Sequence, residues 1–461
     1  MKRILKTLIP ETSAIRLGFH RLKALCAAIR YGFPATKLTV ISMTGTDGKT
    51  TTVGMIAHML NACGLKTAAI STAFFRIGDD IRWNATQKTS PSPFTIQRFL
   101  RDAWKSGCTH AVIECSSHGL LQGRVNHTYP LIAGITNVSE EHLDYHGSME
   151  NYIEAKSMLF RMLPLTGSKV LHYSDRSFSV LCNISSARTI LYDAEETQVD
   201  SRTGAPLNLW TEELTNDADG LNAVILWKDK GGSEERFPVH LGIPGKFNLE
   251  NALCAVGCIL ALPSHPNLYA MVAALASFKG VPGRMEQIKA GQNFSVFIDF
   301  TVTPKSYEAT LRTLRSMLPP GKRLLVLAGS CGDRMKEKRP VIGNVCSLLA
   351  EVSVITNEDP YTENPESIID EVLSGVSLDV PIFRDSASVP DSLPAKCCIR
   401  ISDRLKAIRY LLQLAKKDDI VLLCGKGSDT TMMTDVGQIP WNERAIVTAE
   451  LRTLYPQTPA L

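Results

Sequence analysis

The stretch between residues 39 and 62 constrains the fold of this chain more than any other part of the sequence. It opens with a β-branched and apolar run, residues 39–43, and then passes through a short polar turn that contains two glycines. Apolar side chains recur after the turn at helical spacing, from Val53 to Leu60. The pattern predicts a strand, a tight loop and a helix in direct succession.

The loop has the residue types of a polyphosphate site. Gly45 and Gly48 leave room for backbone amides to surround phosphate oxygens at the positive end of the following helix. Lys49 supplies a cation for the β- and γ-phosphates, and the Thr50 hydroxyl is placed to ligate magnesium. Only two residues separate the glycines, so the full G-x-x-x-x-G-K-[ST] pattern is not met, and a glycine turn with an incidental lysine is the alternative. The position between strand and helix favours an ATP site.

Length and composition indicate a soluble protein of several domains. A chain of 461 residues is too long for one ordinary core, which predicts two or three domains. Hydrophobic residues make up 44% and charged residues 21%, and no apolar run is long enough to span a bilayer. A net charge of +4 is too small to suggest nucleic acid as a partner. The twelve cysteines include no C-x-x-C pair, so we expect reduced thiols and a cytoplasmic location.

The first 38 residues are basic and contain a single acidic residue, Glu11. They lack the apolar core and the cleavage site of a secretory signal. From Ser13 to Tyr31 apolar residues recur every three or four positions, with basic residues between them, which predicts an amphipathic helix. Such a helix could pack on the following domain. Residues 1–35 could instead make a peripheral contact with an anionic membrane or a partner protein.

Further polar residues suit a site beside the phosphate loop. A buried run ends at Glu114, and ligands bind at the carboxyl edge of open α/β sheets. A carboxylate there is a natural magnesium ligand, although a capping role for Glu114 is the alternative. The next predicted strand, residues 131–136, leads into the polar run 137–147 and then into a helix that carries Lys156. A turn at residues 88–92 offers hydroxyls that could bind a ligand or cap the helix that follows.

The downstream sequence predicts two more sheet regions. Residues 170–240 alternate short β-rich runs with polar turns, which indicates a small, partly antiparallel subsheet. Beyond a hinge segment at 281–286, repeated strand-then-helix units predict a second parallel sheet. Its strands are expected at 294–300, 323–328, 351–356 and 420–424, and its helices at 304–317, 336–349 and 365–374.

The predicted architecture is α/β: a P-loop ATPase domain with a mostly parallel sheet, followed by a Rossmann-like α/β domain. We place the boundaries so that a basic helical segment spans residues 1–38, the ATP-binding domain spans 39–282 and the C-terminal domain spans 283–461.

Taken together, the motifs resemble those of the Mur ligases. In one order the chain carries Thr-Gly-Thr-Asp-Gly-Lys-Thr-Thr-Thr, Glu-Cys-Ser-Ser-His-Gly-Leu, Asn-Val-Ser-Glu-Glu-His-Leu-Asp-Tyr-His-Gly, Pro-Gly-Lys-Phe-Asn-Leu-Glu-Asn, Pro-Gly-Arg-Met-Glu, Gly-Asp-Arg and Gly-Lys-Gly. The resemblance covers about residues 40–461 and is closest to the MurE branch, which adds the third residue to UDP-N-acetylmuramoyl-L-alanyl-D-glutamate. It implies an ATP- and Mg2+-dependent amide ligase of peptidoglycan precursor synthesis, which joins a free amino acid to a muramoyl-peptide carboxylate through an acyl phosphate.

The resemblance also implies roles for individual residues, with Lys49, Glu114, His142 and Lys156 in catalysis. It implies a nucleotide site made of Gly45, Thr46, Gly48, Lys49, Thr50, Thr51, Asn251 at the adenine, Arg284 and Asp299. It implies one magnesium ion on Thr50 and Glu114, and a second on His142 and a carbamylated Lys156. The muramoyl peptide would lie at Thr89, Ser90, Ser116, Gln122 and Arg124, and the incoming amino acid at Arg334, Asp359, Tyr361, Gly425 and Asp429.

Several positions depart from the family pattern. The family carries a uridine-nucleotide-binding domain before the phosphate loop, whereas only the basic helix is expected here. Val302 replaces a histidine, and Tyr361 replaces the arginine that reads the distal carboxylate in diaminopimelate-adding enzymes. Since Asp359 and Asp429 would make this pocket acidic, we expect a basic diamino acid such as L-lysine or L-ornithine to be preferred over diaminopimelate.

Two other functions compete with a muramoyl-peptide ligase. A folylpolyglutamate synthase resembles the Mur ligases in fold and ATP motifs, but the Ser-Ser-His-Gly-Leu and Gly-Asp-Arg runs favour the MurE side. A non-catalytic nucleotide-binding scaffold is the alternative from a different class. The retention of Lys49, Thr50, Glu114, His142 and Lys156 argues against it.

Overall fold

The computed structural model describes residues 13–194, 207–217, 220–390 and 392–456. The chain divides into two compact units at about Gly280. The short segment Glu140–Tyr145 groups with the second unit although it lies in the first part of the sequence. Within the described ranges no helix is both long and apolar enough to cross a membrane.

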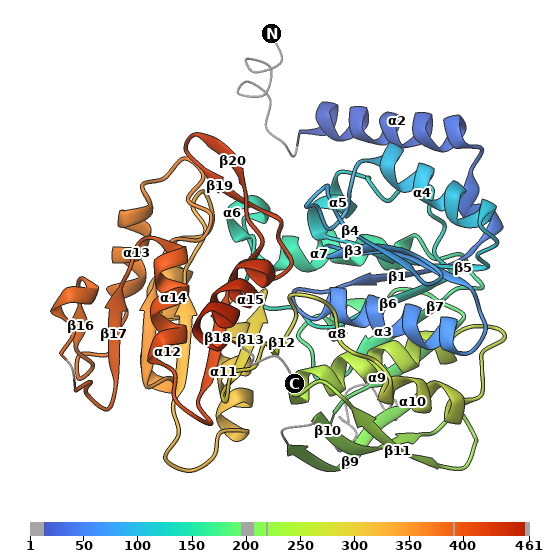
Figure 1. Ribbon diagram of the computed structural model, residues 1–461. Helices are drawn as coiled ribbons and strands as arrows, with labels where there is room; N and C mark the ends of the chain where they lie inside the picture. Colours follow the sequence, from blue (N-terminus) through green and yellow to red (C-terminus); the bar gives the residue numbers. More distant parts are fainter. Residues whose placement is uncertain (1–12, 195–206, 218–219, 391, 457–461) are drawn as a thin grey trace. The chain divides into compact units, whose positions relative to one another are not determined.

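A mixed sheet forms the frame of the first unit (Figure 1). Its strands are β1 (Thr39–Thr44), β2 (Thr67–Ile70), β3 (Phe74–Ile77), β4 (Asp80–Trp83), β5 (His110–Glu114), β6 (Ile132–Ile135), β7 (Ser168–His172), β8 (Arg188–Tyr192), β9 (Leu209–Asp217), β10 (Gly220–Trp227) and β11 (Glu235–Leu241). The order across the sheet is β11-β10-β9-β8-β7-β6-β1-β5-β2-β3-β4. β1 lies between β5 and β6 and runs parallel to both, so the loop after β1 leaves the sheet at its carboxyl edge. Both β1 and β5 are almost wholly buried, which is why they read as continuous apolar runs.

The subsheet predicted at 170–240 forms one side of this larger sheet. Strand β7 pairs in parallel with β6, and β7 to β11 extend the same sheet outward. The predicted partly antiparallel character is confirmed at the edge, where β10 pairs with β11. At the opposite edge β3 and β4 add an antiparallel hairpin that the sequence patterns did not reveal.

Helices cover both faces of this sheet (Figure 1). They are α2 (Ala14–Tyr31), the 3-10 helix η1 (Pro34–Lys37), α3 (Lys49–Ala62), α4 (Pro93–Lys105), α5 (Ser117–Leu121), α6 (Leu143–His146), α7 (Met149–Arg161), α8 (Phe178–Leu181), α9 (Lys246–Leu260) and α10 (Leu268–Ala276). On one face α4 and α7 share a core with sheet residues such as Val40 and Ile113. On the other face α3 packs against α9 and α10.

The second unit contains a sheet with the order β12-β13-β18-β14-β15-β17-β16. Its strands are β12 (Glu286–Ile288), β13 (Ser295–Asp299), β14 (Leu324–Ala328), β15 (Val352–Ile355), β16 (Ile382–Phe383), β17 (Cys397–Arg400) and β18 (Ile420–Cys424), and a separate pair is β19 (Thr431–Thr434) and β20 (Gly437–Pro440). All neighbours in the sheet are parallel except β12 and β13. The predicted second parallel sheet is therefore confirmed.

The helices of the second unit also follow the predicted pattern. They are α11 (Pro304–Ser316), α12 (Lys338–Leu349), α13 (Pro365–Leu373), α14 (Arg404–Leu414), α15 (Glu443–Leu454) and the 3-10 helix η2 (Ser386–Ser388). The start of α11 is fixed locally: Pro304 occupies its first turn, and Thr303 and Ser306 form a capping box. Strand β17 and helices α14 and α15 were not predicted.

Candidate active site

The phosphate loop joins β1 to α3 as predicted. Gly45 has a φ of +144° and Gly48 a φ of +80°, in the region that favours glycine. A Cβ on Gly45 would lie 1.9 Å from Thr136 Oγ1, and one on Gly48 would lie 2.1 Å from Asn251 Oδ1. Both glycines are therefore required by close neighbours as well as by backbone conformation.

Residues that follow β6 hold this loop in place. The Thr46 amide donates to the Asn137 carbonyl at 2.7 Å, and the Asp47 amide donates to Asn137 Oδ1 at 3.1 Å. The Thr136 hydroxyl donates to the Asp47 carbonyl at 2.6 Å. We did not single out Asn137 as a site residue, although its place directly after a buried strand was a usable signal.

The loop leads into the first turn of α3. Lys49 bends back over the loop, and its Nζ donates to the Thr46 carbonyl at 2.7 Å. Thr50 and Thr51 follow and are both buried. The positive end of α3 thus begins directly at the loop, which is the arrangement that binds phosphate groups.

Glu114 and Thr50 come together beside the loop. The Thr50 hydroxyl donates to Glu114 Oε2 at 3.0 Å. Thr72 adds two hydrogen bonds to the same carboxylate, from its amide at 2.7 Å and from its hydroxyl at 3.0 Å. Glu114 is 1% exposed, and no lysine or arginine of the described residues lies within ion-pair distance of it. The sequence gave no reason to select Thr72, since nothing around it forms a motif.

This donor set fits magnesium. A buried carboxylate without a cationic partner leaves its charge uncompensated, and Mg2+ is held in proteins by one or two such oxygens together with substrate phosphates. In the described parts of the chain no three His, Cys, Asp or Glu side chains form a metal-binding group. The fit therefore rests on the oxygens of Thr50 and Glu114, with phosphate oxygens to complete the coordination.

Lys156 lies on α7, buried under the same loop. Its Nζ donates to the Gly45 carbonyl at 2.6 Å and sits 4.3 Å from the centroid of the Tyr152 ring. Burial, reinforced by the nearby charge of Lys49, lowers the pKa of Lys156 well below its ordinary value. Tyr152 is a site residue we did not predict: its hydroxyl lies 3.2 Å from Thr46 Oγ1, so it connects Lys156 to the phosphate loop.

Asn251, predicted at the adenine, and His142, predicted as a metal ligand, lie in different places. Asn251 is buried on α9, with Oδ1 3.4 Å from the Thr52 hydroxyl, and it lies against Gly48. His142 lies in the segment Glu140–Tyr145, which groups with the second unit, and has a φ of +59°. The two predicted ligands of the second metal ion, His142 and Lys156, therefore belong to different units.

The five positions predicted for the muramoyl peptide form one polar cluster next to Glu114. It consists of Thr89, Ser90, Ser116, Gln122 and Arg124. The Thr72 hydroxyl donates to Thr89 Oγ1 at 2.9 Å, and the Ser116 amide donates to Ser90 Oγ at 3.0 Å. Arg124 donates to the Ser90 carbonyl at 3.0 Å and to Gln122 Oε1 at 2.9 and 2.6 Å. Ser92, rather than Thr89 or Ser90, caps α4, so those two hydroxyls are not used as caps.

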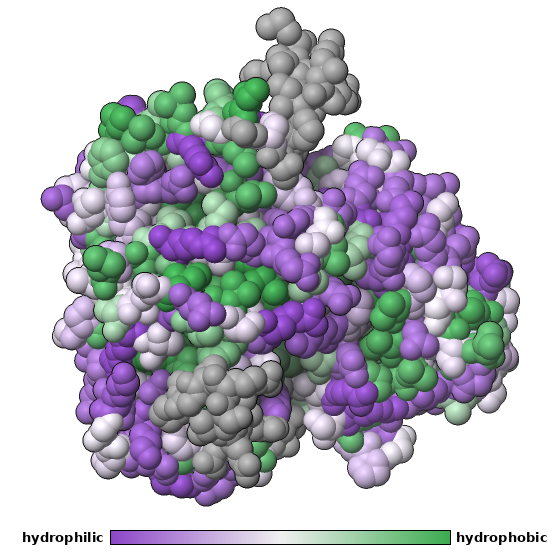
Figure 2. Space-filling model, turned by 180° about the vertical axis from the view of Figure 1, so that it is seen from behind, coloured by the Kyte–Doolittle hydropathy of each residue, from purple (hydrophilic) through white to green (hydrophobic). Residues whose placement is uncertain are grey.

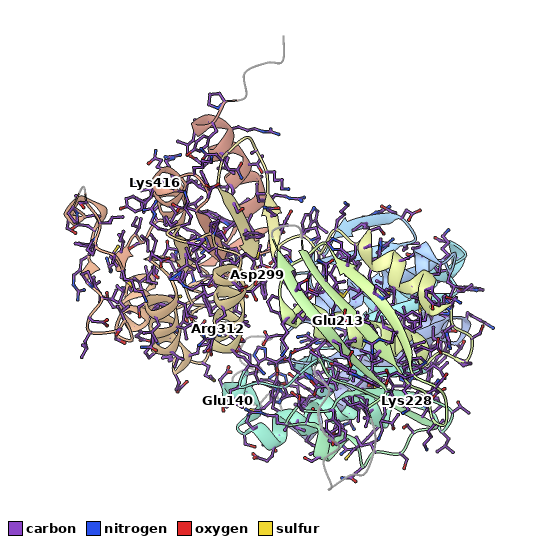
Figure 3. The ribbon with its side chains drawn as sticks, turned by 90° about the horizontal axis from the view of Figure 1, so that it is seen from below. Glu140, Glu213, Lys228, Asp299, Arg312 and Lys416 are labelled. Carbon is purple, nitrogen blue, oxygen red and sulfur yellow. The ribbon has the colours of Figure 1, made fainter. Side chains whose placement is uncertain are left out.

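In the second unit Asp299, labelled in Figure 3, is the last residue of β13, and Arg284 lies over the ring of the next residue, Phe300. Asp299 Oδ1 accepts from the Met285 amide at 2.6 Å, and its Oδ2 accepts from the Thr301 hydroxyl. The Arg284 guanidinium lies 4.2 Å from the Phe300 ring centroid. The Gly425 amide donates to the Asp299 carbonyl at 3.1 Å, which joins this group to the loop after β18.

The positions predicted for the amino acid gather at the ends of β14, β15 and β18. Lys426, which we did not predict, is the centre of this group: its Nζ lies 2.8 Å from Asp359 Oδ2 and 3.2 Å from Asp429 Oδ2. Arg334 lies 5.2 Å from the Tyr361 ring centroid. One buried ammonium is therefore shared by the two carboxylates, which offsets one of their two negative charges.

Comparisons with known proteins agree with this geometry. A family model described as the Mur ligase middle domain matches residues 43–259, and one described as the Mur ligase glutamate ligase domain matches residues 283–427. A UDP-N-acetylmuramoyl-L-alanyl-D-glutamate-2,6-diaminopimelate ligase of Nostoc sp. is 33% identical over 452 residues, which cover 96% of this chain and 83% of the relative. A UDP-N-acetylmuramyl-tripeptide synthetase of Roseiflexus sp. is 33% identical over 428 residues, which cover 91% of this chain and 79% of the relative.

Solved structures give the same result at the level of the fold. A diaminopimelate ligase of the same name as the Nostoc relative superposes with a TM-score of 0.59 at 26% identity, and the match covers 91% of this chain and 79% of that one. A folylpolyglutamate synthase of Mycobacterium tuberculosis superposes with a TM-score of 0.66 at 15% identity over 95% and 96% of the two chains, which shows a shared fold only. The two family models together with the 33% identical relatives show that this chain belongs to the Mur ligase family.

Proposed function

We propose that this protein is an ATP-dependent ligase that joins an amino acid to the carboxylate of a muramoyl peptide. In support, its relatives are named as a UDP-N-acetylmuramoyl-L-alanyl-D-glutamate-2,6-diaminopimelate ligase and a UDP-N-acetylmuramyl-tripeptide synthetase. The observation that carries the proposal is the hydrogen bond between Thr50 and the buried Glu114, which has no cationic partner among the described residues and lies directly beside a glycine loop at a helix N-terminus. This arrangement suits a nucleotide bound with magnesium, because the helix N-terminus attracts phosphate and the buried carboxylate attracts the metal ion.

The residues of the site divide the chemistry between them. The amides at the start of α3 and Lys49 would hold the phosphates, and Thr50 with Glu114 would hold the metal ion, which would supply charge neutralisation during phosphoryl transfer. The polar cluster of Thr89, Ser90, Ser116, Gln122 and Arg124 lies next to Glu114, which suits a carboxylate that accepts the phosphoryl group. The amine of the incoming amino acid then attacks the acyl phosphate, and phosphate leaves.

A panel of substrates tests the proposal. Phosphate release from ATP is measured with UDP-linked and UDP-free muramoyl dipeptides, with a folate substrate plus glutamate, and with each acceptor omitted. We expect release only when a muramoyl dipeptide and an amino acid are both present. Release with the folate pair would support the alternative ligase, and ATP binding without turnover on any pair would support the scaffold.

We also propose that Lys156 is carbamylated. Its ammonium would lie buried beneath a loop that holds Lys49 and a metal ion, and among the described residues no carboxylate forms an ion pair with it. Addition of carbon dioxide to the neutral amine, with loss of one proton, replaces that cation with an anion that can face Mg2+. Labelling with 13C-bicarbonate should give a carbamate NMR signal that is absent from Lys156→Ala. A wild-type spectrum without the signal would contradict the assignment.

For the amino acid we propose diaminopimelate rather than a basic diamino acid. The charge of Lys426 offsets one of the two carboxylates and so weakens the reason for expecting a distal ammonium, and the Nostoc relative is named for 2,6-diaminopimelate. Arg334, exposed beside Tyr361, is the cation we assign to the distal carboxylate. We expect kcat/KM to be highest for meso-diaminopimelate and the preference to disappear in Arg334→Gln. A higher kcat/KM for L-lysine or L-ornithine would restore the original expectation.

A further inference from the structure

Helix α2 buries its small side chains and exposes its large ones. Ala24, Ala27 and Ala28 are fully buried, and the helix packs against α4. A surface helix of a globular domain ordinarily does the reverse, since burial of large apolar side chains is what fixes it to the core. The predicted packing of this helix on the next domain therefore occurs, but it leaves the most apolar face uncovered in the described structure.

The exposed apolar side chains form one continuous stripe. Ile15, Phe19, Leu22 and Ile29 are 78%, 65%, 58% and 61% exposed, and Cys26 lies between the last two on the same line. Their spacing of four, three, four and three residues keeps them on one face of a helix. In Figure 2 hydrophobic atoms accordingly gather at the upper left, over α2.

Basic residues border the stripe on both sides. At 3.6 residues per turn, Arg16, Lys23 and Arg30 fall along one border and Arg21 falls along the other, between the stripe and the buried alanines. The first 46 residues contain eight lysines and arginines and one acidic residue, so no acidic side chain of the helix offsets this charge. An apolar centre with cationic margins is the pattern of a helix that lies in the plane of a membrane interface.

We propose that α2 docks the protein on an anionic lipid surface, with Phe19 and its neighbours among the acyl chains and the basic margins at the headgroups. Charge complementarity selects this occupant. In a dimer formed through the stripe the cationic margins of both copies would be brought together, and one helical stripe is small compared with the roughly 800 Å2 per partner of a stable interface. Docking would hold the ligase at the membrane surface through one face of α2, and no helix of the described ranges is long and apolar enough to cross the bilayer.

Sedimentation of the full chain with vesicles tests this. The vesicles contain phosphatidylcholine alone or phosphatidylcholine mixed with phosphatidylglycerol. We expect binding to the anionic vesicles that weakens as salt is raised. The variant Phe19→Ser/Leu22→Ser/Ile29→Ser should bind at least about tenfold more weakly, and Arg21→Gln/Lys23→Gln roughly tenfold more weakly.

Matched controls use equally exposed residues elsewhere. Leu165, Leu378 and Val436 are 90%, 105% and 86% exposed, and changing them to serine should leave vesicle binding intact. The pair Lys228→Gln/Lys230→Gln controls for the removal of charge. Equal binding to both vesicle types, or equal loss in the control variants, would overturn the proposal. The proposal would also be overturned if the wild type formed a dimer and did not bind vesicles, and if the Phe19→Ser/Leu22→Ser/Ile29→Ser variant were monomeric.

Discussion

Two lysines that lie beyond the carboxyl ends of strands, Lys156 near β1 and Lys426 after β18, are equally buried but differ in the charge of their neighbours. Lys156 in the first unit and Lys426 in the second are each 1% exposed. Lys156 meets a carbonyl and an aromatic ring, whereas Lys426 meets the carboxylates of Asp359 and Asp429. Burial alone would lower both pKa values, but these carboxylates outweigh it and raise the pKa of Lys426, while that of Lys156 falls.

The difference distinguishes a lysine without a counter-ion from one that has two. Among the described residues no carboxylate is in ion-pair contact with Lys156, and no lysine or arginine with Glu114. Charge balance there must come from bound or added groups. The charge of Lys426 is instead compensated within the protein, by Asp359 and Asp429, so this lysine connects the loops after β15 and β18.

The largest expected effect is the loss of activity in Lys156→Ala. If the carbamate contributes to metal binding, its removal should lower kcat by about a thousandfold, and added acetate should restore part of the activity by supplying a carboxylate. Phosphate release with the full substrate set is the measurement.

Lys169→Ala is the control for Lys156. Lys169 is 2% exposed and donates to the carbonyls of Leu181, Cys182 and Ile184, away from the phosphate loop. Its removal should lower Tm, and acetate should not rescue it. Rescue of both variants by acetate, or of neither, would mean that Lys156 is a structural lysine like Lys169.

Lys426→Met should act on stability first. It leaves the buried Asp359 and the partly exposed Asp429 without their cation, and removing one partner of a buried ion pair costs about 3–5 kcal/mol. Adding Asp359→Asn and Asp429→Asn removes the charges while keeping the hydrogen bond that Asp359 accepts from the Met433 amide, so most of the loss should be recovered. Urea unfolding of the single and triple variants measures this. A triple variant no more stable than Lys426→Met would show that the ion pairs are not what stabilises this group.

A smaller effect is expected for Gly48→Ala in the phosphate loop. The new Cβ meets Asn251 Oδ1, and the φ of +80° is unfavourable for alanine, which together cost about 1–3 kcal/mol. The double variant Gly48→Ala/Asn251→Ala relieves the clash but not the backbone strain, so it should recover part of the stability. Full recovery would mean that the backbone conformation contributes nothing, and it would weaken the case for a preformed loop.

Local patterns were sufficient to predict the elements on which both sites are built. The change from strand to helix periodicity at residues 39–62 predicted β1 and α3, and the end of a buried strand correctly placed Glu114 next to Thr50. The β3–β4 hairpin was missed although polar and apolar residues alternate along β4, which is exposed along its whole length. Strand β17 was missed because its sequence, Cys-Cys-Ile-Arg, contains a single β-branched residue.

Partners that are distant in sequence were the part that could not be predicted. Thr72 contacts Glu114 across 42 residues, and Lys426 contacts Asp359 across 67. Neither contact can be predicted from the local sequence around its residues. For that reason Asp359 and Asp429 were interpreted as an acidic pocket, when the fold brings a lysine between them.

The smallest effect is expected from a second ion pair of the second unit, between Glu363 and Arg339, and it concerns the pH dependence of stability. Glu363 accepts from Arg339 at 2.9 Å through both of its oxygens, and it also accepts from the Asp333 amide at 2.7 Å. The Arg339 hydrogen bonds lower the pKa of Glu363 from 4.5 to about 2. Because the folded-state pKa is lowered, this carboxylate stabilises the fold above pH 4.5, and the contribution is lost as the pH falls from 4.5 toward about 2.

Glu363→Gln should therefore flatten the dependence of unfolding free energy on pH in that window. Glu371 also pairs with Arg339 but is more exposed than Glu363, so Glu371→Gln should leave most of the pH dependence in place. If the two variants had equal slopes, the pairing of Glu363 would be no stronger than an ordinary surface contact.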